Sequence, residues 1–165
     1  MTIRNKIEKG LEWTLVFIMT ILVVDVTWQV ISRYIMSSPS SFTDELAGFL
    51  LIWVGLLGAA YVAGKREHLA IDILLQKSSP SRRYKLEMTI SILIVFFSIA
   101  VLVVGGIWLS YTRFYLGVRS AALGLPLGFV YMVLPISGIL IAYFDIDHIF
   151  QLVRLNRKNQ THGIL

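Results

Sequence analysis

The sequence predicts an all-α membrane protein with four transmembrane helices, and composition, charge placement and the length of its apolar stretches support this fold class. Apolar residues make up 56% of the 165 residues, the mean hydropathy is +0.74, and charged residues make up only 15%. A soluble domain carries about 25% charged residues. Four apolar stretches reach the roughly 20 residues that a helix needs to cross a bilayer core. These spans are expected at about residues 12–35, 44–64, 86–111 and 127–150, with a tail at 151–165, so that residues 1–165 form one membrane domain.

The distribution of Lys and Arg predicts the orientation of the helices. Twelve of the 15 basic residues lie before the first span, between the second and third, or after the fourth. Only Arg33, Arg113 and Arg119 lie on the other side. The positive-inside rule therefore places both termini in the cytoplasm. Because the basic residues flank apolar stretches, the net charge of +5 indicates a membrane surface as the partner and not nucleic acid.

Two further segments are expected to lie at the membrane interface. Residues 67–77 are too few to cross, and His68, Asp72 and Gln76 recur there every four residues. This spacing predicts an amphipathic helix that lies in the plane of the cytoplasmic interface or docks on a partner. The first ten residues alternate charged residues with Ile and Leu, which indicates a similar location.

Asp25 is the one carboxylate well inside a predicted span. A charge at that depth costs about 3 kcal/mol on insertion scales, so Asp25 is a candidate functional residue. Gln29 and Arg33 follow at intervals of four on the same helix face, but Arg33 lies about 12 Å from Asp25 along the axis, too far for a direct pair. This face is either a coupling-ion or proton site, or a polar stripe that packs against another helix or a partner. A lone carboxylate without converging ligands favours the stripe.

Asp44 and Glu45 open the second span, where carboxylates interact favourably with the helix dipole. Ser41 or Thr43 is expected to cap this helix. Arg33 leaves the first span at the same level, so an ion pair with Asp44 or Glu45 is expected to clamp the hairpin.

Small residues at intervals of four in the second span are typical of close helix packing in membranes. The two pairs are Gly55 with Ala59 and Ala60 with Gly64. We expect Gly55 and Ala59 to contact another helix or a partner subunit; the alternative is that these are ordinary glycines and alanines of a membrane helix. Pro135 in the fourth span predicts a kink that neighbouring helices must satisfy.

Several kinds of chemistry are not expected. The chain has no cysteine, which excludes disulfides and thiolate sites. The pattern shows no nucleophile–base arrangement, and the three histidines lie at helix ends or in the tail, unsuited to haem. The neighbouring His68 and Asp72 are too few ligands for a metal. Catalytic, cofactor and metal sites are therefore all expected to be absent.

Five features occur in a characteristic order. They are Arg33, the segment 41–46 with its acidic pair, the Trp-x-x-x-x-Gly-Ala run in 53–60, the basic-x-His-x-x-x-Asp pattern in 65–72, and residues 120–126 followed by Pro135. Together they resemble the small membrane (Q) subunit of tripartite ATP-independent periplasmic (TRAP) transporters, over about residues 12–150.

The resemblance implies a scaffold subunit of a bacterial inner-membrane importer of organic acids, sialic acid or C4-dicarboxylates. A large (M) subunit would hold the substrate and sodium sites, so no cofactor is expected in this chain. A periplasmic binding protein would deliver the substrate, and Arg113 and Arg119 are candidates for contacting it. Anchoring of these two arginines to lipid phosphate or water is the alternative.

A self-sufficient, proton-coupled small exporter is the competing function. Small multidrug transporters also have four short helices and a carboxylate in the first, which would make Asp25 the proton and drug site. The greater length, the 67–77 segment and the strong charge bias of this chain argue against an exporter.

Overall fold

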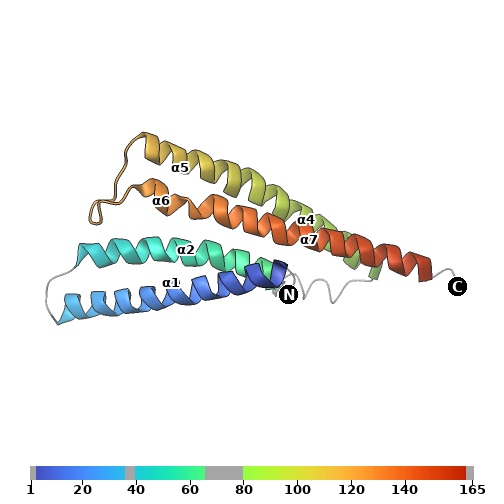
Figure 1. Ribbon diagram of the computed structural model, residues 1–165, viewed down its shortest axis with the longest axis horizontal. Helices are drawn as coiled ribbons and strands as arrows, with labels where there is room; N and C mark the ends of the chain where they lie inside the picture. The colour runs from blue at the N-terminus through green and yellow to red at the C-terminus, as the bar shows by residue number, and fades with distance from the viewer. Residues whose placement is uncertain (1–2, 36–39, 66–79, 163–165) are drawn as a thin grey trace.

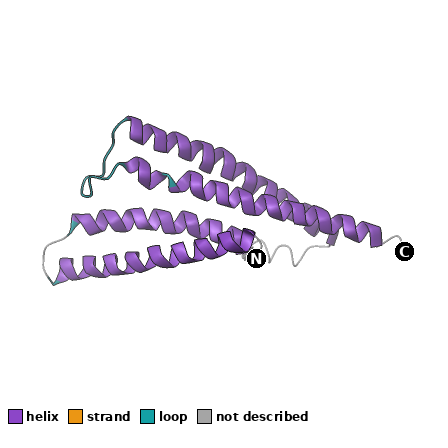
Figure 2. Ribbon diagram, viewed as in Figure 1, coloured by secondary structure: helices purple, strands orange, loops and turns teal. Residues whose placement is uncertain are grey.

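The computed structural model describes residues 3–35, 40–65 and 80–162. Figure 2 shows that these residues are helical except for short connections. In chain order the elements are α1 (Ile3–Tyr34), α2 (Ser41–Lys65), α4 (Pro80–Phe97), the π-helix η1 (Ser98–Gly105), α5 (Gly106–Tyr115), α6 (Leu127–Tyr131) and α7 (Val133–His162).

Four helical segments are long and apolar enough to cross a membrane, which confirms the predicted fold class. The third combines α4, η1 and α5, and the fourth combines α6 and α7 (Figure 1). Their bounds are Arg4–Tyr34, Ser41–Lys65, Arg82–Tyr115 and Leu127–Asn156.

The four spans lie in a row (Figure 1). α1 packs along α2, α2 packs along α7, and the third span packs along α7 on its other side. Along the helix axes, the four spans have two common ends. Both termini lie toward the end at which α2 ends and α4 begins, which we call the terminal end. The opposite end, which we call the hairpin end, holds the α1–α2 connection and the loop of residues 116–126 between α5 and α6.

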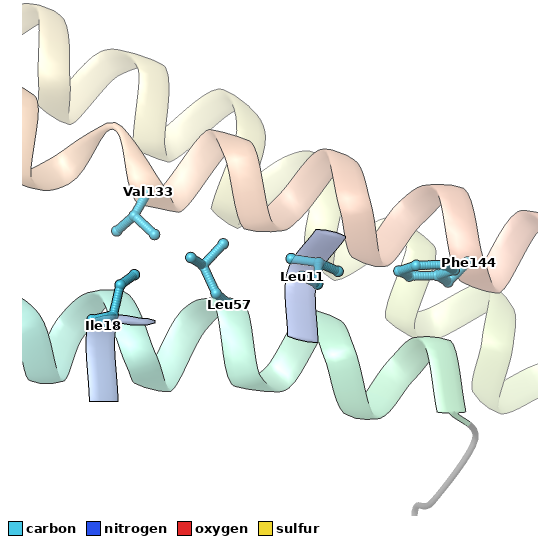
Figure 3. Close-up of a cluster of buried hydrophobic side chains, with 5 residues drawn as sticks. All are labelled: Leu11, Ile18, Leu57, Val133 and Phe144. Atoms are coloured by element: carbon cyan, nitrogen blue, oxygen red, sulfur yellow. The ribbon is translucent and has the colours of Figure 1, made fainter. Parts of the chain in front are cut away.

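A cluster of buried apolar side chains joins α1, α2 and α7 (Figure 3). Its members are Leu11, Ile18, Leu57, Val133 and Phe144. The Phe144 ring lies so close to Gly64 that a Cβ on this glycine would be 3.1 Å from it. Ala60, one turn before Gly64, is fully buried. This pair of small residues therefore packs inside the chain, whereas Gly55 and Ala59 face outward, and a contact of these two with a partner subunit stays a prediction.

The π-helix η1 and the start of α5 pack very closely on α7, a feature that the sequence did not predict. A Cβ on Gly138 would lie 2.7 Å from Leu102 Cβ, and one on Gly106 would lie 2.7 Å from Leu134 Cβ. Ser98 is fully buried in this interface, and its hydroxyl donates to the Val95 carbonyl of its own helix at 2.9 Å. Small side chains thus let two membrane helices approach closely, as is common in lipid.

The predicted kink near Pro135 is present as the break between α6 and α7 at Met132. Proline lacks the N–H that would continue the helical ladder. Trp53 on α2 donates its indole Nε1–H to the Val130 carbonyl at 3.1 Å, near the break. A side chain of a neighbouring helix therefore binds a backbone carbonyl beside the break.

Several helices are longer than the spans predicted from the apolar stretches. Residues 3–10, part of the segment expected at the interface, belong to α1, which begins at Ile3. Residues 151–162 of the predicted tail continue α7, and Leu152 is buried. The predicted interfacial helix at 67–77, with His68, Asp72 and Gln76, lies outside the described residues.

Candidate functional site

The polar side chains singled out in the sequence gather mainly at the hairpin end. They come from the last turns of α1, the first turn of α2 and the 116–126 loop. A second polar cluster holds the terminal end together, and Asp25 lies between the two.

Glu45 on α2 binds the 116–126 loop through four hydrogen bonds. Its Oε2 accepts from the Ser120 hydroxyl at 3.0 Å and from the N–H groups of Ala122 and Leu123 at 2.8 and 3.0 Å. Its Oε1 accepts from the Ala121 N–H at 3.1 Å. Successive backbone N–H groups that converge on one anion form a nest, and bonds to an ionised acceptor are short and strong. Glu45 therefore fastens the start of the second span to the connection between the third and fourth.

The loop is folded so that its donors face this carboxylate. Gly117 and Gly124 have φ angles of +61° and +66°, which favour glycine. The Leu127 N–H donates to the Val118 carbonyl at 3.0 Å, which draws the two ends of the loop together. The Ser120 hydroxyl also accepts the Leu123 N–H at 3.1 Å, so this serine belongs to the nest and to the loop.

The expected ion pairs of Arg33 are wrong in this structure. The Gln29 amide, one turn earlier, donates to Asp44 Oδ1 at 2.5 Å and occupies that carboxylate. Glu45 points elsewhere because consecutive side chains on a helix diverge by about 100°. Arg33 lines a hollow of about 250 Å³ with Gln29 and Asp44, and it makes no ion pair with any residue that the structure describes. An amide–carboxylate bond thus closes the α1–α2 hairpin.

The cap of α2 also differs from the prediction. Ser40, and not Ser41 or Thr43, precedes the first helical residue. Its carbonyl accepts the Thr43 hydroxyl at 3.0 Å and the Asp44 N–H at 3.3 Å.

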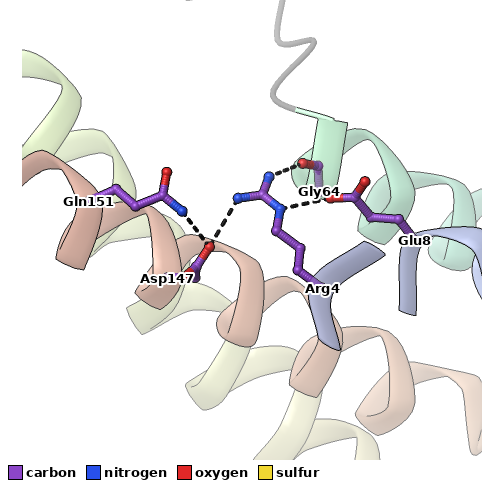
Figure 4. Close-up of polar contacts among 5 residues, drawn as sticks. All are labelled: Arg4, Glu8, Gly64, Asp147 and Gln151. Carbon is purple, nitrogen blue, oxygen red and sulfur yellow. Dashed lines mark hydrogen bonds and ion pairs between the residues drawn. The ribbon is translucent and has the colours of Figure 1, made fainter. Parts of the chain in front are cut away.

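Arg4 organises the terminal end (Figure 4), a role that was not predicted from the sequence. Its Nε donates to Glu8 at 2.7 Å, its Nη1 donates to Asp147 on α7 at 3.0 Å, and its Nη2 donates to the Gly64 carbonyl on α2. The Gln151 amide donates to the same Asp147 oxygen at 2.7 Å. One guanidinium therefore joins α1, α2 and α7. The spacing of four in Arg4–Glu8 and Asp147–Gln151 was the only sequence signal.

The two arginines proposed for docking lie in different surroundings. Arg113 is partly buried, with its guanidinium 5.8 Å from the centroid of the Tyr131 ring. Arg119 is exposed on the loop, where its Nη1 reaches the Gly124 carbonyl at 3.4 Å. Arg119 is therefore the better placed of the two for an external contact.

Asp25 lies apart from Gln29 and Arg33, so the predicted polar stripe is divided. It is only 7% exposed and lines a separate hollow of about 350 Å³ between α1 and α2. The parts of the chain that the structure describes provide no hydrogen-bond partner for its Oδ2.

Comparison with known proteins connects this arrangement to one family. Residues 22–155 match the family described as tripartite ATP-independent periplasmic transporters, DctQ component. A TRAP transporter small permease protein of Haemophilus influenzae is 28% identical over 138 residues, which cover 82% of this chain and 83% of that protein. The sialic acid TRAP transporter small permease protein SiaQ of Vibrio cholerae is 26% identical over 151 residues, 92% of this chain and 84% of that protein. The sialic acid TRAP transporter permease protein SiaT of Haemophilus influenzae is 36% identical over 104 residues, 62% of this chain but 16% of that protein.

Proposed function

Because this chain belongs to the DctQ component of the tripartite ATP-independent periplasmic transporters, we propose that it is the scaffold of a sodium-coupled importer of organic acids. The chain is a small permease subunit, a multi-pass membrane protein and a transporter component, not an enzyme. In the proposed complex a large TRAP membrane (M) subunit binds the substrate and sodium, and a periplasmic binding protein delivers the substrate. This chain needs no cofactor for that role.

The binding of Glu45 to the 116–126 loop is the observation that carries the scaffold role. Glu45 belongs to the acidic pair of the family resemblance, and its carboxylate accepts hydrogen bonds from the hydroxyl and backbone N–H groups of residues 120–123. Trp53, from the same resemblance, binds the backbone of α6. These side chains hold the helices of this chain together, as a rigid supporting subunit requires.

The row of spans suits a subunit that lies along a larger membrane protein. Large apolar side chains on several spans are strongly exposed, for example Val24 at 65%, Phe96 at 70% and Trp108 at 74%. Such surfaces face lipid or a partner. The match to SiaT also supports a large partner, because the similar segment is a small part of a much longer permease.

The charge distribution supports an orientation in the bacterial inner membrane with both termini in the cytoplasm. Basic residues such as Arg4, Lys65, Arg82 and Arg83 belong to the terminal end, while Arg33, Arg113 and Arg119 belong to the hairpin end. The positive-inside rule then directs the hairpin end toward the periplasm. The exposed Arg119 would contact the binding protein there. The names of SiaQ and SiaT favour sialic acid over C4-dicarboxylates as the substrate.

Co-purification tests the proposed assembly. This chain would be expressed with the large permease subunit proposed as its partner, and an affinity tag on this chain would be used to isolate it in mild detergent. A stoichiometric complex that retains the binding protein on a column is the expected result. Recovery of this chain alone, from membranes in which both chains are present, would contradict the proposal.

A further inference from the structure

We propose that the hollow around Asp25 is where a membrane helix of the large partner subunit docks, bringing a hydrogen-bond-donating side chain to the Asp25 carboxyl group. The proposal rests on the proposed function, since it assumes a large partner, and it specifies where and by what chemistry that partner is held.

The hollow has an apolar wall with one carboxyl group in it. It is shallow, has a volume of about 350 Å³ and opens on the outside of the α1–α2 pair. Besides Asp25 its lining is Thr20, Ile21, Val24, Trp28, Thr43 and Leu46. Val24 and Trp28 are 65% and 50% exposed, so they offer apolar surface beside the carboxyl group.

The two hydroxyl donors that line the hollow are already in use. The Thr20 hydroxyl donates to the Val16 carbonyl at 2.8 Å, and the Thr43 hydroxyl donates to the Ser40 carbonyl at 3.0 Å. The Gln29 amide, one turn from Asp25, donates to Asp44. Asp25 Oδ2 is buried and receives no hydrogen bond from any described residue. A buried carboxyl group without a partner is costly, and more so in a bilayer.

Arg33 does not neutralise Asp25. It is eight residues further along α1, about 12 Å along the axis, and it lines the other hollow with Gln29 and Asp44. No described residue donates to Asp25 Oδ2, and in this proposal the donor is a side chain of the partner helix.

A partner helix fits this hollow better than substrate or a metal ion. The organic acids proposed as substrates are anions, which a carboxylate in an apolar wall repels. A hard cation is usually held by six or more oxygen ligands, and here one carboxylate stands among mainly apolar side chains. A membrane helix gains dispersion contacts with the apolar wall and one interhelical hydrogen bond, the terms that drive helix association in lipid.

Site-specific photo-crosslinking tests the location. A benzophenone amino acid would replace Val24 or Leu46 at the hollow, and Ile107 on α5, which is 55% exposed, would serve as the control position. The expected result is efficient crosslinking of positions 24 and 46 to the large subunit in the purified complex. An intact complex in which both positions crosslink only to lipid would overturn the proposal while leaving the proposed function standing.

Substitution of Asp25 tests the chemistry. Asp25→Leu should lower the yield of complex about ten-fold relative to its own level in membranes, because it removes a hydrogen bond to a carboxyl group. Thr27→Val is the matched control, since Thr27 is an exposed residue of the same helix that does not line the hollow. An unchanged yield for Asp25→Leu would overturn the proposal. Failure of the unaltered chain to form a complex would instead refute the proposed function.

Discussion

Glu45 and Ala122 are separated by 77 positions in the sequence, yet the carboxylate of Glu45 accepts the backbone N–H of Ala122 at 2.8 Å. This bond and its three neighbours cross from the second span to the connection between the third and fourth. They fix the hairpin end of the row, which is the end that we propose faces the binding protein.

Loss of the Glu45 carboxylate should release the 116–126 loop. In Glu45→Ala, hydrogen exchange at the amides of Ala121, Ala122 and Leu123 should speed up by about ten-fold or more. The loop can then open locally without the cost of breaking its bonds to the carboxylate. Hydrogen–deuterium exchange with mass spectrometry would measure it. Asp44→Ala is the control, since Asp44 binds Gln29 and not the loop. Equal protection of these amides in Glu45→Ala and in the unaltered chain would contradict the claim that Glu45 holds the loop.

Arg4→Ala should destabilise the terminal end. The substitution removes bonds to Glu8, Asp147 and the Gly64 carbonyl, and leaves Asp147 without its cation. The expected cost is about 1–3 kcal/mol in the free energy of unfolding. Unfolding of the purified chain in detergent would be compared with that of Lys6→Ala, an exposed basic residue of the same helix. A similar loss of unfolding free energy in both variants would contradict a specific role for the Arg4 contacts, because loss of any positive charge on α1 would then have the same effect.

Alanine at two glycines should change stability in opposite directions. At Gly138 the added methyl group would lie 2.7 Å from Leu102 Cβ and 3.0 Å from the Ser98 carbonyl oxygen, so Gly138→Ala should cost about 1–3 kcal/mol. At Gly55 the methyl group meets nothing within 4 Å, and alanine should stabilise the helix by about 0.5–1 kcal/mol. Thermal unfolding of each variant in detergent would show the two signs. Equal effects would contradict the close packing of η1 on α7.

Single cysteines can establish the orientation, because the natural chain has none. In intact cells with a permeabilised outer membrane, a membrane-impermeant maleimide should label Arg119→Cys at the hairpin end. It should leave Lys6→Cys unlabelled until the inner membrane is opened. Both positions are exposed, so accessibility within the protein does not bias the comparison. Labelling of Lys6→Cys in intact cells would reverse the proposed topology.

The fold class was predictable because crossing a bilayer imposes a local requirement on composition. Each span needs its own apolar stretch, and hydropathy alone located all four. The bounds were less predictable, since α1 and α7 are longer than the apolar stretches that predicted them. The row arrangement depends on contacts such as Phe144 on Gly64, which join distant segments and leave no periodic signal.

The site was only partly predictable. Asp44 and Glu45 were predicted as carboxylates at the start of the second span, but as partners of Arg33, and Gln29 was predicted only as a member of the polar stripe with Asp25. In the structure the Gln29 amide binds Asp44, and backbone N–H groups of the 116–126 loop bind Glu45. Side-chain identities do not reveal that backbone N–H groups will converge on a carboxylate. The Arg4–Asp147 pair was missed for a similar reason, since its members are 143 positions apart.

Sodium-driven uptake in proteoliposomes tests the central claim most directly. Radiolabelled sialic acid and a C4-dicarboxylate would be offered to vesicles that hold this chain alone, or this chain with the large subunit and the binding protein. The scaffold role predicts uptake only by the complete system and only with an inward sodium gradient. Transport by the isolated chain that is abolished in Asp25→Asn would contradict it and would make the chain a small transporter in its own right.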